Sequence, residues 1–544
     1  MRTDLDNLWF KNAVFYELYI RAFCDSNADG NGDLKGLLGQ LDYLKELGVD
    51  CIWLLPFYPS PLLDDGYDVA DYYNIHPDYG NLQDFKAVLA AAHERGIRVI
   101  TDLIVNHTSY LHPWFQAARE DPNSPYRDYY VWSDDPNKYS GARIIFIDTE
   151  TSNWSWDEKA GQYYWHRFYA SQPDLNFDNP AVQQAMLDIM AFWLDLGIDG
   201  FRADAVPYLF EREGTNCENL PETHAYLKKM RRFIDEHYPG RVLLCEANQW
   251  PMDVRAYFGL GDEFQMAFNF PVMPRIYMAL SLQDRTPVVE ILNATPQIPD
   301  DCQWCTFLRN HDELTLEMVT PEERDYMWET YAPLPRMRLN LGIRRRLAPL
   351  LNGDRRKIEL LNSILFTLPG SPIIYYGDEI GMGDNIWLKD RDGVRTPMQW
   401  SSETNAGFSD APPDELYHQP IKEGPYAYTL VNVEAQRADS GSLWHTLKNM
   451  IQVRKQSNVF GSGTNEFLNV DDLSILAFIR AYEDEYLLAV HNLSDVERTV
   501  ELDLSRWAGK DLHEVLQGEN FPQITPEPYR VTLAPYQYLW LKPL

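Results

Sequence analysis

The sequence predicts an α/β protein: a (β/α)8 TIM barrel with an inserted subdomain after strand 3 and a C-terminal antiparallel β-sandwich domain. Three observations predict this. Short β-prone runs alternate eight times with amphipathic helical stretches, which is typical of a closed parallel barrel. A long stretch with little helical period separates the third run from the fourth. After about residue 459 the pattern changes to short alternating strands, as in antiparallel β domains.

The expected barrel strands are residues 14–20, 51–56, 99–105, 200–204, 242–246, 265–270, 305–309 and 373–376. Amphipathic stretches at 34–47, 82–95, 181–196 and 224–238 are the expected helices between them. In such barrels the chemistry lies at the C-terminal ends of the strands. Long segments that leave those ends are therefore expected beside the site.

The expected division of the chain has three parts. Residues 1–108 and 175–455 form the catalytic barrel, with lid segments at about 313–356 and 377–442, because long loops beside a site often close over it. Residues 109–174, rich in Trp, Tyr, Asp and Pro, form the inserted subdomain. Residues 456–544 form the C-terminal domain, with strands expected at 473–480, 485–492, 498–504, 530–533 and 536–541.

Composition excludes some classes of partner. The 81 acidic and 48 basic residues give a net charge of −33, which argues against nucleic acid or an anionic membrane. No apolar run approaches the ~20 residues of a membrane span, and the start of the chain shows no signal-peptide pattern. Six scattered cysteines suit reduced thiols. We therefore expect a cytoplasmic protein.

Three acidic residues close expected strands or follow them directly: Asp204, Glu246 and Asp312. Carboxylates at the rim of a barrel are held rigidly and can be brought close together. Paired carboxylates on rigid supports are what glycosidic bond chemistry requires. The alternative is that these acids only cap helices, but the position of all three at strand ends argues against it.

The motifs around these acids resemble those of the α-amylase superfamily of glycoside hydrolases, over essentially the whole chain. The matching motifs are Asp102-Leu-Ile-Val-Asn-His107, Gly200-Phe-Arg-Ala-Asp204, Glu246, Asn310-His-Asp312 and Gln172-Pro-Asp-Leu-Asn176. Any one of them alone is a weak signal. Five in order, on the expected strands, are a strong one.

The resemblance implies a role for each acid. Asp204 is the nucleophile, Glu246 the general acid/base and Asp312 the stabiliser of the transition state. A retaining mechanism of this kind places two carboxyls about 5–5.5 Å apart. Arg202 is expected to keep Asp204 ionised, whereas a neighbouring carboxylate favours the proton that Glu246 must hold.

The resemblance also implies a pocket that holds one glucose from its non-reducing end. Ala205 after the nucleophile favours α-1,4 over α-1,6 bonds by the same resemblance. By the same resemblance, residues 64–68 form the segment that closes this pocket. An ordinary Asp-Gly turn is the simpler interpretation of these residues, and the segment can be both. The implied substrate-binding residues are Asp64, Tyr67, His107, Gln172, Arg202, His311 and Arg395.

One or two structural Ca²⁺ sites are expected, and no organic cofactor. Oxygen-bearing side chains alternate in one loop, as hard-cation loops require, although the EF-hand glutamate is replaced by Gly36; an Asx-rich turn without metal is the alternative. The resemblance implies a second site that ties the inserted subdomain to the barrel. The ligands expected for the first site are Asp25, Asn27, Asp29, Asn31 and Asp33, and those for the second are Asn106, Asp174, Glu211 and the carbonyls of Tyr208 and Leu209.

Passages outside the five motifs, at 57–66, 310–319, 351–356 and 377–400, resemble family members that interconvert maltose and trehalose. The resemblance implies a disaccharide substrate, intramolecular glucosyl transfer through a glucosyl–Asp204 intermediate, and minor hydrolysis to glucose. An α-glucosidase that hydrolyses α-1,4 disaccharides and a non-catalytic sugar-binding protein are the alternatives. A homo-oligomer associated through the β domain is compatible with the resemblance.

An isomerase of this kind must exclude water while it retains a released glucose. Our hypothesis is that the two lid segments and the inserted subdomain do this together. Glu313, Glu317 and Arg143 are the candidates for bridging contacts. The alternative for each of them is a charge on a solvated helical face.

Overall fold

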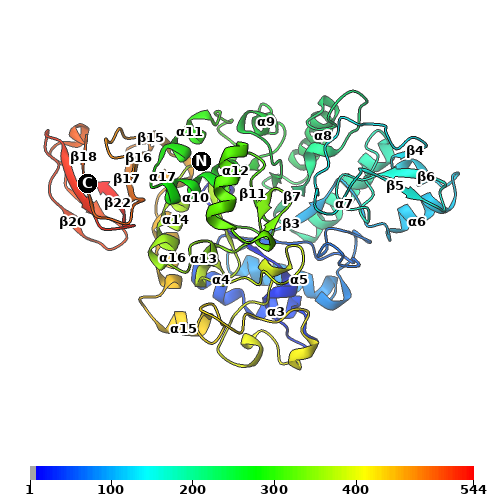
Figure 1. Ribbon diagram of the computed structural model, residues 1–544, viewed down its shortest axis with the longest axis horizontal. Helices are drawn as coiled ribbons and strands as arrows, with labels where there is room; N and C mark the ends of the chain where they lie inside the picture. Colours follow the sequence, from blue (N-terminus) through cyan, green and yellow to red (C-terminus); the bar gives the residue numbers. More distant parts are fainter. Residues whose placement is uncertain (1–7) are drawn as a thin grey trace.

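The computed structural model describes residues 8–544, so Met1–Asp6, where we expect no signal peptide, lies outside the described residues. Eight parallel strands close into a barrel in the order β1-β14-β10-β9-β8-β7-β3-β2. All eight expected strands are present, and the predicted barrel is confirmed (Figure 1). The strands are β1 (Phe15–Leu18), β2 (Cys51–Leu54), β3 (Arg98–Ile104), β7 (Gly200–Asp204), β8 (Val242–Cys245), β9 (Met266–Phe268), β10 (Gln303–Phe307) and β14 (Ser371–Tyr375).

The barrel strands are short apolar runs because both of their faces are covered. All residues of β1, β2 and β8 are buried. Outer helices begin and end where the sequence signals it: α5 (Leu82–Glu94) starts with a capping box of Asn81 and Asp84, and α7 (Pro180–Leu196) ends at Gly197 in the left-handed conformation. α8 (Pro221–His237) is the next helix along the chain and lies between β7 and β8 in sequence.

The helix expected at 34–47 is two helices, α3 (Leu34–Gly39) and α4 (Leu41–Leu47). The break falls at Gln40, whose backbone leaves the helical region at φ −103° and ψ 3°. Gly39 directly before it lowers the helix propensity of this turn. The prediction of one continuous helix was therefore wrong.

The stretch between β3 and β7 forms a lobe at one side of the barrel, drawn in cyan in Figure 1. It contains α6 (Pro113–Glu120) and a small sheet of order β4-β6-β5, made of β4 (Trp132–Ser133), β6 (Gln162–Trp165) and β5 (Trp154–Asp157). Isolated bridges from His107 to Asp174 and from Tyr130 to Leu175 join its two ends. The lobe therefore stands beside the C-terminal end of β3.

The segment after β10 folds into a three-stranded sheet and α12 (Pro321–Tyr331). The sheet has the order β11-β13-β12, with β11 (Leu314–Thr315), β13 (Gly342–Ile343) and β12 (Arg338–Leu339). Glu313 and Glu317 flank β11, so the alternative of a solvated helical face is wrong for them. The segment after β14 is mostly irregular up to α15 (Val433–Ala438).

The C-terminal part is a six-stranded sheet that packs with a two-stranded sheet (β18-β21) around a core of its own, which includes Ile479, Val490, Val500 and Leu533. It lies at the end of the molecule opposite the inserted lobe (Figure 1). The large sheet has the order β15-β16-β17-β22-β19-β20. The strands are β15 (Thr464–Phe467), β16 (Ile475–Tyr482), β17 (Glu485–Asn492), β18 (Arg498–Leu502), β19 (Leu512–Glu514), β20 (Asn520–Phe521), β21 (Tyr529–Leu533) and β22 (Tyr538–Pro543).

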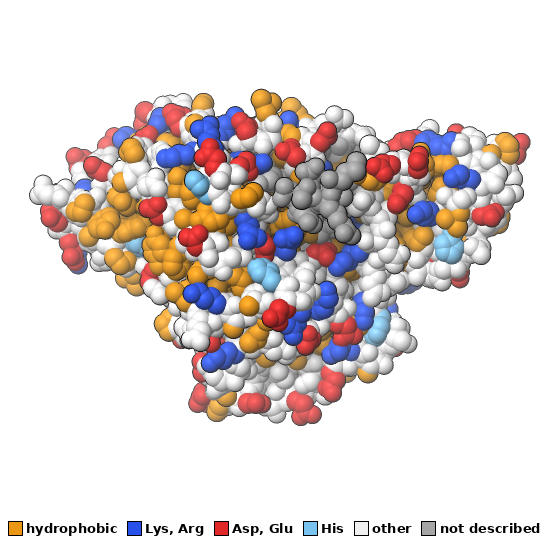
Figure 2. Space-filling view, turned by 180° about the vertical axis from the view of Figure 1, so that it is seen from behind, with side chains coloured by type: hydrophobic (Ala, Val, Ile, Leu, Met, Phe, Trp, Pro, Cys, Tyr) orange, Lys and Arg blue, Asp and Glu red, His pale blue; other side chains and the backbone are white. Residues whose placement is uncertain are grey.

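The surface carries interspersed acidic and basic side chains on the face shown in Figure 2, with apolar side chains gathered over part of it. All six cysteines are free thiols, as expected. Within residues 8–544 no helix combines the length and apolarity that crossing a membrane requires.

Candidate active site

One pocket at the C-terminal end of the barrel brings the three acids together. Asp204 is the last residue of β7, Glu246 follows β8 directly, and Asp312 lies in the loop after β10. All three line the same pocket. Because neighbouring parallel strands end at the same rim, strand ends distant in sequence become neighbours here.

Arg202 joins the carboxylates. It lies two residues before Asp204 on β7 and is almost fully buried (1% exposed). One of its nitrogens lies 2.7 Å from Asp204 Oδ1 and 2.5 Å from Asp102 Oδ1, and the other lies 2.5 Å from Glu246 Oε1. The guanidinium therefore holds Asp204 and Glu246 side by side.

The two carboxyls differ in their affinity for a proton. Burial raises the pKa of Glu246 to about 7; Arg202 opposes the shift, and the nearby charges of Asp204 and Asp312 add to it. Burial also raises the pKa of Asp204, to about 6, again against Arg202. Glu246 is therefore the carboxyl that keeps its proton to the higher pH.

The backbone between these acids is strained. Ala205 has φ 52°, in the left-handed region that residues with a Cβ seldom adopt. In this conformation its N–H donates to Glu246 Oε2 at 3.1 Å. The turn after Asp204 thus helps to fix Glu246, and strain of this kind is usual at functional sites.

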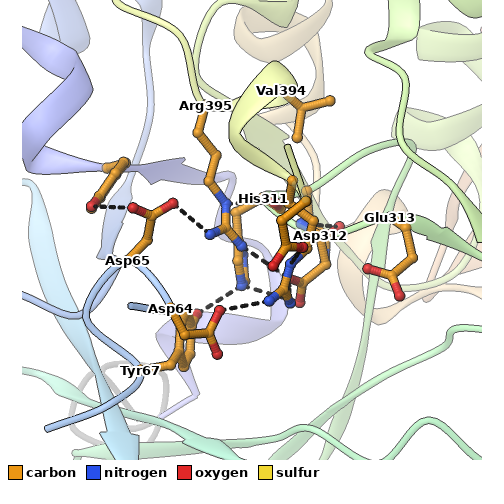
Figure 3. Close-up of polar contacts among 12 residues, drawn as sticks. Asp64, Asp65, Tyr67, His311, Asp312, Glu313, Val394 and Arg395 are labelled. Carbon is orange, nitrogen blue, oxygen red and sulfur yellow. Dashed lines mark hydrogen bonds and ion pairs between the residues drawn. The ribbon is translucent and has the colours of Figure 1, made fainter. Parts of the chain in front are cut away.

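Asp312 is held by three cations. Arg391 and Arg395 donate to its Oδ1 at 2.8 and 3.1 Å, and His311 Nε2 lies 3.1 Å from its Oδ2. Although burial works in the opposite direction, His311 and the two arginines hold the pKa of Asp312 well below its usual range. Asp312 is therefore ionised where Glu246 is protonated. In Figure 3, Arg395 reaches between Asp65 and Asp312.

Asp64 and Arg391 meet at the inner part of the pocket lining. Arg391 donates to Asp64 Oδ1 at 2.6 Å, and the side chain of Gln172 donates to Asp64 Oδ2 at 2.9 Å. The Tyr67 ring stacks on His311 at 5.2 Å, and its hydroxyl lies 2.7 Å from His311 Nε2. We define this network as the inner wall: Asp64, Tyr67, Gln172, His311, Asp312, Arg391 and Arg395.

His107 is neutral in this site. Burial lowers the pKa of His107 to about 4. Its Nε2 lies 3.1 Å from the carbonyl oxygen of Tyr67, which can only accept, so the proton is on Nε2. The ring lines the pocket beside Phe168.

The residues expected to bind the sugar thus fall into two groups. Asp64, Tyr67 and His107 line the pocket. The other four do not line the pocket but contact residues that do, namely Asp64, Asp204 or Asp312. They are Gln172, Arg202, His311 and Arg395.

A second set of contacts joins the inserted stretch to the outer part of the pocket lining. Arg143, from the inserted stretch, lies 2.8 Å from Glu317 Oε2 and 2.9 Å from Glu218 Oε1. It also donates to the Tyr208 hydroxyl at 3.2 Å. Glu317 and Tyr208 line the pocket. We call Arg143, Glu218 and Glu317 the outer latch.

Further contacts join the same segments. The backbone N–H of Asn340, after β12, donates to Asp148 of the inserted stretch at 2.7 Å. The Tyr169 hydroxyl donates to Asp390 Oδ2 at 2.5 Å, which connects the inserted stretch to the segment after β14. Glu313 lines the pocket and accepts from Asn340 at 3.3 Å.

The residues expected to hold a second calcium ion fit a cation. Oδ1 of Asn106, Oδ2 of Asp174 and Oε1 of Glu211 are buried and accept no hydrogen bond from any described residue. Burial raises the pKa of Asp174 to about 8 and that of Glu211 well above its usual value. Buried carboxylates of this kind are stabilised by a cation. No group of three or more His, Cys, Asp and Glu side chains suited to a metal occurs in residues 8–544, but this set depends on an amide and main-chain carbonyls.

The loop expected to hold the first calcium ion satisfies its own oxygens. Asp25 accepts from the backbone N–H groups of Asn27, Ala28 and Gly30 and from the hydroxyl of Ser409. Asp33 accepts from Ser26 and from the N–H of Gly36, where it caps α3. Asn31 Oδ1 accepts from Arg21. These contacts are those of the alternative, an Asx-rich turn.

Several residues of the site were missed in the sequence. Arg391 lies four residues before Arg395, within the passage 377–400 whose resemblance was considered only as a whole. A second arginine so close to Arg395 was the signal that could have identified it. Glu218 offered no signal. Glu17, a lone carboxylate inside the apolar run of β1, did offer one, because a buried strand seldom contains a charge without a partner.

The chain matches the model of the α-amylase catalytic domain over residues 17–332 and 344–463, and that of the maltogenic amylase C-terminal domain over 465–540. It is 58% identical over 99% of its length to the trehalose synthase/amylase TreS of Mycolicibacterium smegmatis, of which the match covers 93%. It is 57% identical over 98% of its length to a trehalose synthase of Pimelobacter, with 96% of that protein covered. The chain belongs to the α-amylase family.

Solved structures agree with this assignment. The isomaltulose synthase PalI of Klebsiella superposes with a TM-score of 0.79 at 28% identity, over 98% of this chain and 99% of that one. An α-amylase from H. orenii superposes with a TM-score of 0.78 at 30% identity, over 98% of this chain and 100% of that one.

Proposed function

We propose that this protein is an isomerase that interconverts maltose and trehalose by intramolecular transfer of a glucosyl group, with minor hydrolysis to glucose. Relatives that are 57–58% identical over nearly the whole chain are trehalose synthases. The observation in the structure that carries the proposal is the set of contacts that tie the inserted stretch and both lid segments together around the pocket. The inner wall admits one sugar end, and the outer latch covers the leaving sugar.

The first half of the reaction forms a covalent intermediate. Protonated Glu246 gives its proton to the glycosidic oxygen while an oxygen of Asp204 attacks the anomeric carbon. The bond from that carbon to the glycosidic oxygen breaks, glucose leaves with the proton, and Glu246 becomes ionised. Asp312 strengthens its hold on the sugar hydroxyls as the ring flattens.

The second half reverses these roles. The released glucose turns inside the closed pocket until its anomeric hydroxyl faces the glucosyl ester. The oxygen of that hydroxyl attacks the anomeric carbon of the ester while Glu246 takes the hydroxyl proton. The bond from that carbon to Asp204 then breaks. Two displacements retain the α configuration and give the α,α-1,1 bond of trehalose.

Water competes with the released glucose for the same ester. Ten transfers for each hydrolysis require a difference in barrier of only about 1.4 kcal/mol. Contacts that keep the lid shut can supply this difference. Arg143 with Glu317, Asp148 with Asn340 and Tyr169 with Asp390 join the inserted stretch to both lid segments, which supports our lid hypothesis.

An α-glucosidase remains the second candidate, because it uses the same three acids. Purified protein incubated with maltose and analysed by chromatography separates the two. Mostly trehalose with a little glucose supports the isomerase, whereas glucose alone contradicts it. A binding protein without activity would give neither product.

We also propose that a calcium ion binds between Asn106, Asp174 and Glu211, together with the carbonyls of Tyr208 and Leu209. Such an ion supplies positive charge that neutralises two buried carboxylates. We keep as a further proposal that the loop from Asp25 to Asp33 binds another calcium ion. We expect the enzyme to act in the cytoplasm and to associate through its β domain, which light scattering would test.

A further inference from the structure

Glu17 is a buried carboxylate of β1 with no part in the reaction described above. Its side chain is 0% exposed. Its Oε1 accepts from the backbone N–H of His311 at 3.1 Å and from His311 Nδ1 at 2.6 Å. Within residues 8–544, its side chain accepts no other hydrogen bond, and Oε2 has no partner. His311 is therefore its whole polar environment.

The other side of the imidazole faces the catalytic site. His311 Nε2 lies 3.1 Å from Asp312 Oδ2 and 2.7 Å from the Tyr67 hydroxyl. Asp312 Oδ2 and the Tyr67 hydroxyl oxygen can both accept from Nε2, and Glu17 Oε1 accepts from Nδ1. An imidazolium, which donates from both ring nitrogens, satisfies these contacts.

The surroundings favour the charged ring. Burial lowers the pKa of His311, but Asp312 and Glu17 together raise it to about 9. The edge of Trp53 and the face of Tyr67 pack against the ring. The other charged groups nearby are Asp102, behind Tyr67, and Arg395, which donates to the carbonyl oxygen of His311.

We propose that Glu17 is a positioning residue for the glucosyl transfer: it fixes His311 as an oriented imidazolium, which keeps Asp312 ionised and aimed at the sugar. This inference rests on the proposed function only for its effect on rate. The bond from Glu17 to His311 is a property of the protein by itself.

The charge of Glu17 has a specific task in this arrangement. Asp204, Glu246 and Asp312 line one small pocket, and one of them must carry a proton for the first step. Like charges at close range drive a proton onto whichever carboxyl is least stabilised in its ionised form. A cation fixed at His311 directs that proton away from Asp312 and toward Glu246.

The test is Glu17→Gln, which keeps the size and one hydrogen-bond acceptor but removes the charge. We expect kcat for maltose to fall about 10- to 100-fold, less than the 10²–10³-fold lost when such an electrostatic group is deleted. KM should change much less. The pH profile of kcat/KM should also change shape, because His311 then loses its proton within the working range of the enzyme.

The matched control is Glu379→Gln. Glu379 is also 0% exposed and accepts from two tyrosine hydroxyls, those of Tyr16 and Tyr43, on the far side of β1 from the site. If buried carboxylates matter here only for the fold, both variants should lose stability and neither should change its pH profile.

Nuclear magnetic resonance of ¹³Cε1-labelled histidine gives a readout that is independent of activity, with the His311 signal assigned from a His311→Asn variant. We expect an imidazolium signal at pH 7.5 in the wild type and in Glu17→Asp, and a neutral ring in Glu17→Gln. A neutral His311 in the wild type overturns the proposal even if trehalose is made. An imidazolium in a protein that makes only glucose overturns the proposed function alone.

Discussion

Ion pairs stand at the inner and the outer part of the pocket, but the chain builds them differently. At the inner end, Arg391 links Asp64 to Asp312, and the side chains of Arg391 and Asp64 are only 7% and 6% exposed. At the outer end, Arg143 is 36% exposed where it contacts Glu317. The inner pair joins loops of the barrel, whereas the outer one joins the inserted lobe to the segment after β10.

The difference in burial indicates a difference in task. Removing one partner of a buried pair leaves an uncompensated charge and costs about 3–5 kcal/mol, so the inner wall stays shut. An exposed pair contributes about 0.2–1 kcal/mol, so the outer latch can open for substrate and close again. Under the proposed function, the inner wall would select the sugar, and the outer latch would favour glucose over water as the acceptor.

Asp204→Asn should have the largest effect, because Asp204 is the proposed nucleophile for both transfer and hydrolysis. We expect transfer and hydrolysis to fall together by about 10⁴-fold or more, since the covalent intermediate can no longer form. Release of maltose-derived trehalose and glucose, measured by chromatography, checks this. Loss of one activity without the other would mean that Asp204 is not the shared nucleophile.

Arg391→Ala breaks the inner wall and should rank second. A loss of 3–5 kcal/mol in the organisation of the site corresponds to roughly 10²-fold to nearly 10⁴-fold in kcat/KM. The ratio of trehalose to glucose should stay the same, because the acceptor end is untouched. Arg355→Ala, which breaks an exposed pair with Glu359 far from the pocket, is the control and should leave kcat/KM unchanged.

The pH profile follows from the two carboxyls at the centre of the pocket. Activity requires Asp204 ionised, so it should fall as the pH drops below about 6. It also requires Glu246 protonated, so it should fall as the pH rises above about 7. The expected profile of kcat/KM is a narrow bell. A profile that is flat from pH 5 to 9 would contradict these roles.

Arg143→Ala, Glu317→Ala and the double variant test the outer latch. Loss of about 1 kcal/mol of closure should raise the share of glucose among the products by up to about fivefold. Total turnover should remain within about threefold, because the acids and the inner wall are intact. Arg506→Ala removes a more exposed pair with Glu466 in the β domain and is the control. An unchanged glucose share in the double variant would exclude the latch from water exclusion.

Removal of calcium should have the smallest effect on the reaction. A site filled at 100 times its dissociation constant adds about 2.7 kcal/mol to the free energy of unfolding. Chelation should therefore lower Tm by several degrees and leave the trehalose-to-glucose ratio unchanged. In Asp174→Asn the chelator should no longer shift Tm. A shift that persists in that variant would place the ion elsewhere.

Much of the site could be predicted because it depends on strand ends. In a closed parallel barrel the C-terminal ends of all strands lie at one rim. The β-prone runs before Asp204, Glu246 and Asp312 therefore place all three acids at that rim. Arg391 and Glu218 could not be predicted. Their partners, Asp64 and Arg143, lie far away in sequence and meet them only when loops fold back over the barrel.

By itself, the sequence determined the eight-stranded barrel, the separate β domain and the rim that carries the acids. Those features follow from local periodicity and from the closure of parallel strands. Only the tertiary structure decided the protonation order and the closure of the pocket. A pKa depends on burial and on charges within a few ångströms, and segments far apart in the chain supply both around Glu246, His311 and Arg143.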